Sequence, residues 1–149
     1  MTQVKGFSMI ELMIVVVVLS VLASMFYPAF QQYVVRSRRA EAQAMLQRLM
    51  AQQERYYTQH NSYVAFSARA SDPEAALFTW WSGRSAPVSA YELEGKACEG
   101  ELIADCVQLI ATPGTSAVDA QFKDPACGTL ILKSTGQHLA TGPAARCWQ

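Results

Sequence analysis

Hydrophobic and polar positions divide the chain into three regions. From Leu12 to Val35 the sequence has no charged residue, and Leu12 to Phe30 is almost wholly apolar. The next stretch, Gln31 to Tyr57, has no Gly or Pro and is rich in good helix formers. Beyond it Gly, Pro, Ser and Thr become frequent and the helical pattern ends. We therefore predict one long helix over 7–57 and a loop-rich globular head over 58–149.

The predicted helix has two halves of different character. Residues 7–35 are apolar on every face, which requires lipid or several apolar neighbours. At ~1.5 Å per residue, the apolar run nearly spans a ~30 Å hydrocarbon core. Residues 36–57 are amphipathic and need only one packing surface. The expected buried face consists of Val35, Ala42, Met45, Leu49, Gln52 and Tyr56. Pro28 is expected to kink the helix, because it removes a backbone hydrogen bond.

The head is predicted to contain a small antiparallel sheet. Short β-type runs alternate with turn signals at Thr112-Pro113-Gly114 and Ser134-Thr135-Gly136. The expected strands are Tyr91–Leu93, Val107–Ala111, Thr129–Leu132 and Gln137–Leu139, and a short helix is expected over Glu74–Phe78. A sheet packed on the amphipathic half of the helix gives an α+β fold.

Net charge and cysteine content bear on the partners of the protein and on its cellular compartment. The formal net charge is zero, so nothing global points to nucleic acid. The four cysteines are Cys98, Cys106, Cys127 and Cys147, and they form no C-x-x-C pair. An even number downstream of an apolar segment favours disulfides in an oxidising compartment. Three pairings are open, and spacing does not choose among them.

Glu11 sets apart two interpretations of the N-terminal segment. A carboxylate inside a membrane helix costs ~2.5–3.5 kcal/mol unless it is paired. A secretory signal peptide, with Leu12–Leu22 as its apolar core and cleavage after Ala23, leaves Glu11 unexplained. A retained helix needs a partner for that charge.

Charge near the helix also gives one opposing signal. Arg36, Arg38 and Arg39 follow the apolar run, whereas Lys5 stands almost alone before it. The positive-inside rule would place the head in the cytoplasm. The cysteines favour the opposite side, because disulfides seldom persist in the cytosol. We follow the cysteines and expect a periplasmic head.

The sequence Lys5-Gly6-Phe7-Ser8-Met9-Ile10-Glu11-Leu12 resembles the prepilin cleavage motif of type IV pilins and pseudopilins. The resemblance implies that a prepilin peptidase cuts after Gly6, removes leader 1–6 and methylates Phe7. The protein would then rest in inner-membrane lipid through residues 7–35. An assembly platform would move it into an extracellular filament, with 7–35 in the core. There Glu11 would pair with the amine of Phe7 on a neighbouring pilin and set the register.

Two further stretches, Arg36–Val64 and Ala111–Trp148, resemble the PilE-like minor pilins, to which the DNA-receptor minor pilin ComP looks related. This implies the type IV pilin fold, with the second half of the helix on the sheet. It also implies that Cys127 pairs with Cys147 and Cys98 with Cys106. The expected function is a minor pilin that primes or joins the pilus and supports twitching motility, adhesion or DNA uptake.

Three alternatives remain open: a ComP-like DNA receptor, a type II secretion pseudopilin, and a secreted domain. Residues 63–149 carry six basic and nine acidic residues. A DNA receptor wants a basic stripe, so this balance disfavours DNA, although Lys123, Lys133 and Arg146 could cluster. No catalytic constellation, cofactor motif or metal-ligand spacing stands out. We therefore expect a structural subunit rather than an enzyme, with no cofactor or metal.

Overall fold

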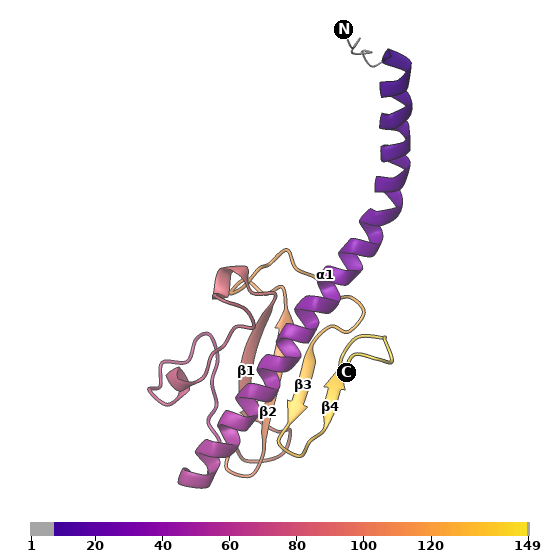
Figure 1. The fold of residues 1–149 in the computed structure, drawn as a ribbon. Helices are drawn as coiled ribbons and strands as arrows, with labels where there is room; N and C mark the ends of the chain where they lie inside the picture. Colours follow the sequence, from indigo (N-terminus) through magenta and orange to yellow (C-terminus); the bar gives the residue numbers. More distant parts are fainter. Residues whose placement is uncertain (1–7, 149) are drawn as a thin grey trace. The chain divides into compact units, whose positions relative to one another are not determined.

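The computed structural model describes residues 8–148, apart from the side chains of residues 25, 26, 28 and 29. A long helix, α1, is followed by a four-stranded antiparallel sheet (Figure 1). The elements are α1 (Met9–His60), η1 (Ala75–Leu77), η2 (Ala86–Val88), β1 (Tyr91–Ala97), β2 (Val107–Pro113), β3 (Leu130–Lys133) and β4 (His138–Ala140). The strands lie in the order β1-β2-β3-β4. The predicted α+β architecture is confirmed.

The chain forms two compact units, Met1–Arg36 and Ser37–Gln149, and α1 contributes to both. In the first unit α1 continues through position 28, so Pro28 does not end the helix. The kink predicted at this position stays a prediction. Among the described residues, no helix is long and apolar enough to cross a membrane.

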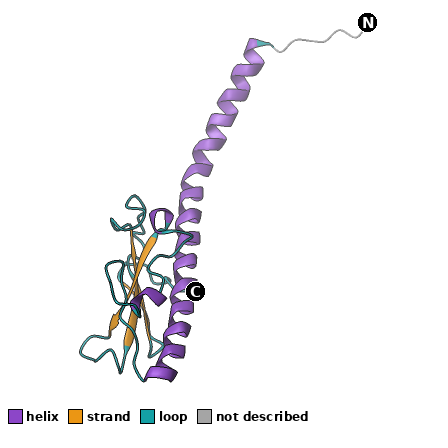
Figure 2. Ribbon diagram, turned by 90° about the vertical axis from the view of Figure 1, so that its left-hand side faces the viewer, coloured by secondary structure: helices purple, strands orange, loops and turns teal. Residues whose placement is uncertain are grey.

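In the second unit, the last part of α1 lies along one face of the sheet (Figures 1 and 2). In β1 and β3 alternate residues are buried, as the period of a half-buried strand requires. The fully buried members of this core include Ala42, Leu46 and Leu49 of α1 and Tyr91, Leu93, Val107, Leu109, Ala111 and Leu130 of the sheet. The unit therefore has its own hydrophobic core.

The buried face of α1 differs from the predicted one. Ala42 and Leu49 are buried and Met45 and Tyr56 are partly buried, but Val35 and Gln52 are not at the centre. Leu46, Gln43 and Gln53 are buried instead. Gln53 tolerates full burial because its amide donates to Val64 O at 2.7 Å and accepts from Val64 N–H at 2.9 Å. The amide of Gln43 likewise donates to Cys147 O.

Two elements extend beyond their predicted bounds. α1 reaches His60 and stops at Asn61, whose φ of 51° is left-handed, a conformation that asparagine adopts more readily than most residues. β1 continues to Ala97 because Gly95 pairs on both sides. Gly95 faces Leu109 in β2 and exchanges two 2.9 Å hydrogen bonds with Phe66. A Cβ at Gly95 would lie 2.5 Å from the Phe66 ring, so the close approach requires glycine.

The remaining strands lie within one or two residues of their predicted bounds. The hairpin between β3 and β4 turns at Ser134-Thr135-Gly136, where Gly136 has a φ of 82°. β2 ends at Pro113, and Gly114 follows with a φ of 61°. η1 lies inside the predicted short helix, whereas η2 was not predicted.

Candidate functional site

The first turn of α1 carries the charge that the sequence singles out. Glu11 lies in this turn and is exposed. The predicted cleavage and methylation residues, Gly6 and Phe7, lie outside the described residues. The structure therefore places one member of the expected pair and leaves the pairing as a proposal.

Around Glu11 the helix exposes a continuous apolar surface. From Met9 to Leu22, the large hydrophobic side chains are between 47% and 83% exposed. Exposed apolar patches of this extent mark surfaces that bind protein or membrane. This surface can contact apolar neighbours along its whole length, as a helix that packs in a bundle must.

A buried ion pair ties α1 to the loop before β3. The Arg39 guanidinium donates from Nε and Nη2 to the two carboxylate oxygens of Asp124, both at 2.7 Å. The Tyr91 hydroxyl donates to Oδ2 at 2.6 Å, and the Cys127 N–H donates to Oδ1 at 3.2 Å. The Asp124 side chain is fully buried and that of Arg39 is 13% exposed. Every oxygen of the buried carboxylate is thus satisfied.

The pKa directions follow from this geometry. Burial alone would raise the pKa of Asp124, but hydrogen bonds from Arg39, Tyr91 and the Cys127 N–H outweigh it and lower the pKa. The hydrogen bond to Asp124 raises the pKa of Arg39. Burial, followed by the neighbouring carboxylate, raises the pKa of Tyr91. All three groups keep the charge state in which the network is complete.

The C-terminal segment is fastened beside this network. Cys127 and Cys147 form a disulfide with a Cα–Cα distance of 5.5 Å, and the Gln43 amide of α1 donates to the Cys147 carbonyl. Trp148 follows, and its Nε1–H donates to Leu139 O in β4 at 2.8 Å. The second disulfide joins Cys98 to Cys106 at the end of the β1–β2 hairpin. The two pairings are the ones that the resemblance implied.

The three basic residues considered for DNA occupy different surroundings. Lys133 lines a hollow together with the acidic residues Glu99, Glu101 and Asp105. Lys123 and Arg146 are exposed, and they directly precede Asp124 and Cys147 in the sequence. The structure therefore surrounds Lys133 with carboxylates instead of joining it to the other two.

Sequence reasoning missed Arg39, Asp124 and the two buried glutamines as structural residues. Arg39 and Asp124 are 85 residues apart, and no local pattern connects them. Gln53 did leave a signal, because it lies four residues after Leu49, in phase with Ala42 and Leu46. A polar residue in phase with an apolar face is a candidate for a buried hydrogen bond.

Known pilins resemble parts of the chain. The type IV major pilin protein PilA of Myxococcus xanthus is 35% identical over 63 residues, which cover 42% of this chain and 29% of PilA. The fimbrial protein EcpC of Eikenella corrodens is 53% identical over 38 residues, which cover 26% and 25% of the two chains. The chain thus spans less than a third of either relative. A solved type IV pilin from Shewanella oneidensis aligns with a TM-score of 0.47 at 24% identity, over 77% of this chain and 98% of that one.

Two family models match adjoining parts of the chain. The prokaryotic N-terminal methylation motif matches residues 1–27. The family described as "Type IV minor pilin ComP, DNA uptake sequence receptor" matches residues 28–131. Because this second match spans more than half of the chain, the protein belongs to the ComP family of type IV minor pilins.

Proposed function

We propose that this minor pilin enters a pilus by burying the apolar part of α1 among the helices of neighbouring pilins. The observation that carries the proposal is the exposed apolar surface from Met9 to Leu22. Burying one such side chain contributes ~1.5–3 kcal/mol, so the surface as a whole supplies a large driving force for assembly. The sequence similarity to the pilin PilA and the fimbrial protein EcpC supports other pilins as the partners.

In this proposal Glu11 sets the register between subunits. A carboxylate in an apolar bundle is tolerated where an ammonium pairs with it. The methylated amine of Phe7 on a neighbouring pilin would supply that charge. A subunit docked out of register would leave both charges unpaired, so the pair would act through specificity as well as energy.

Before assembly, the protein would lie in the inner membrane with its head in the periplasm. Support comes from the match to the methylation motif and from the two disulfides, which favour an oxidising compartment. A prepilin peptidase would cut between Gly6 and Phe7, and an inner-membrane platform would deliver the protein to the pilus. Its role there is structural, and we propose no enzymatic activity.

The N-terminal peptide of the protein from its native membrane tests the processing step. Mass spectrometry should find a peptide that begins at methylated Phe7. A peptide that begins at Ser24 would instead identify a cleaved signal peptide. In that case residues 1–23 would be discarded, including Glu11 and the exposed apolar surface from Met9 to Leu22, and the assembly proposal would fail.

DNA binding during uptake is a second candidate, which the description of the family favours. Of the three basic residues predicted for DNA, Lys123 and Arg146 are exposed and lie outside the acidic hollow, so they are the candidate phosphate contacts. The full chain in detergent should retain duplex DNA at low salt and release it as salt rises. Replacing both residues by Ala should weaken retention, whereas Lys133→Ala should have little effect. A protein that retains no DNA at low salt would contradict this role.

A further inference from the structure

The loop between β1 and β2, Cys98–Cys106, exposes the side chain of Leu102 and is closed at its base by a disulfide. The disulfide closes the loop, with a Cα–Cα distance of 5.4 Å, and Cys98 N–H donates to Cys106 O at 3.2 Å. At the tip, the N–H groups of Asp105 and Cys106 donate to Leu102 O at 2.9 and 3.0 Å. The loop is therefore hydrogen-bonded within itself, yet Leu102 is 71% exposed. The disulfide and these hydrogen bonds therefore hold the exposed Leu102 side chain on an ordered loop.

Carboxylates surround this leucine. Glu99, Glu101 and Asp105 are exposed and lie in the same nine-residue loop, from position 98 to 106. Lys133 is the basic residue that lines the hollow beside them. A partner for the loop should therefore offer an apolar hollow with a positive charge at its edge.

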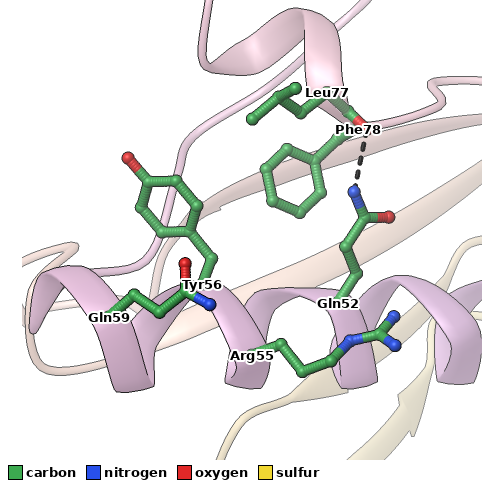
Figure 3. A pocket seen from close by; sticks show the side chains of 6 residues that line it. All are labelled: Gln52, Arg55, Tyr56, Gln59, Leu77 and Phe78. Atoms are coloured by element: carbon green, nitrogen blue, oxygen red, sulfur yellow. Dashed lines mark hydrogen bonds between the residues drawn. The ribbon is translucent and has the colours of Figure 1, made fainter.

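A hollow that combines apolar side chains with polar ones and a positive charge lies on the same chain, between α1 and η1 (Figure 3). It has a volume of about 270 Å³, and Tyr56, Leu77 and Phe78 form its apolar part. Gln52 closes one side by donating from Nε2 to Leu77 O at 2.8 Å. Leu77 is 60% exposed, so this apolar surface is not covered by the described part of the chain.

Arg55 supplies the positive charge at the edge of this hollow. Its side chain lines the hollow, is exposed, and makes no salt bridge within the described residues. The hollow and the loop thus carry complementary features: the exposed Leu77 can face Leu102, and the Arg55 guanidinium can face the carboxylates. Electrostatic complementarity of this type orients a contact and selects its partner.

We propose that the Leu102 loop of one copy of this chain docks into the α1–η1 hollow of a second copy. Leu102 would enter the apolar part, and Glu101 would pair with Arg55. The contact joins two heads and goes beyond the helix bundling of the proposed function. Because the two surfaces differ, it is heterologous, and repeated contacts of this kind extend an open assembly instead of closing a dimer.

Photo-cross-linking of the full chain in detergent tests the contact. A benzophenone side chain replaces Leu102, and labelled and unlabelled copies are mixed so that only links between copies are scored. We expect links to residues 52–59 or 77–78, in about tenfold higher yield than from a benzophenone at the exposed control position Val88. Links from position 102 that are absent, or that fall elsewhere on the second copy, would overturn the proposal.

A charge exchange tests the predicted partners. Arg55→Glu should lower the yield of the cross-link severalfold, and the double variant Arg55→Glu with Glu101→Arg should recover it. Arg48→Glu is the matched control, since Arg48 is an exposed arginine of α1 that does not line the hollow. Failure of the double variant to recover the cross-link, or an equal loss in the control, would show that Glu101 and Arg55 do not pair.

Discussion

At the scale of single residues, Asp124 is the point where three segments of the head meet. Its carboxylate accepts from Arg39 of α1, from Tyr91 of β1 and from the backbone at Cys127. The disulfide of Cys127 then leads to the C-terminal segment. Any other packing of these segments would leave a buried charge without its partners, which costs free energy. The network therefore favours one arrangement of the three segments.

Asp124→Asn should lower the free energy of unfolding of the head by about 2–4 kcal/mol. The substitution keeps the shape but leaves the largely buried Arg39 without its counter-charge. Urea unfolding followed by tryptophan fluorescence measures this, because all three tryptophans lie after residue 79. Glu94→Gln is the control: it breaks the exposed pair with Lys96 and should cost less than about 1 kcal/mol. Equal losses would mean that burial of the Asp124 pair has no energetic weight.

The same network predicts a dependence on acid. The pKa of Asp124 is lowered in the folded protein, so its contribution is present above the unfolded pKa of about 3.9. That contribution is lost as the pH falls through the lower, folded pKa. The stability difference between the unmodified protein and Asp124→Asn should therefore be constant near neutral pH and shrink below about pH 4. Unfolding free energies measured from pH 7 to pH 3 check this, and a difference that persists in acid would contradict it.

At the scale of elements, Gln53 fixes the chain that leaves α1. Its amide brackets Val64 with one donated and one accepted hydrogen bond, eleven residues after its own position. The segment after Asn61 is thereby held against the helix before it reaches Phe66 and the edge of β1. The exit of the helix is thus set by a side chain inside it as well as by the turn residues that follow.

Gln53→Leu should lower the free energy of unfolding by about 2–4 kcal/mol, because both polar groups of Val64 would be left buried without partners. Gln52→Leu is the matched control. Gln52 is less buried and makes one hydrogen bond, to Leu77 O, so its loss should cost about 1 kcal/mol. Hydrogen exchange at the Val64 amide should accelerate only in the Gln53 variant. An unchanged exchange rate would show that the bracket does not protect this backbone.

Local periodicity predicted the elements well where one residue pattern decides the structure. The hairpin around Gly136 and the turn at Gly114 rest on glycines with positive φ, which sequence signals reveal. The length of β1 could not be predicted in this way, because glycine usually weakens a strand. In the structure Gly95 stays in β1 because Phe66 supplies a second backbone partner. The Arg39–Asp124 pair could not be predicted either, since it depends on how distant segments pack. Glu11 stood out in the sequence, but its expected partner belongs to another chain.

At the scale of the whole molecule, the two units differ in whether their apolar side chains are buried within the chain. The unit Ser37–Gln149 has a buried core, two disulfides and an internal ion pair, so its stability comes from its own residues. The apolar side chains of α1 before position 23 have no such cover within the described chain. A variant can therefore damage assembly without damaging the head, and this allows the role of Glu11 to be tested separately from folding.

Glu11→Gln should reduce the amount of this protein in sheared pili at least about tenfold, because the Phe7 ammonium of a neighbour would be buried without a counter-charge. Its amount in the membrane and its mature N-terminus should not change, since the head is intact and the cleavage site is kept. Glu41→Gln provides the matched control: Glu41 is also on α1, but it pairs with Arg38 of its own helix at 3.2 Å on the head's surface. Immunoblots of the pilus and membrane fractions measure both variants. Normal incorporation of Glu11→Gln would show that Glu11 does not set the register between subunits, and assembly would then rest on apolar contacts alone.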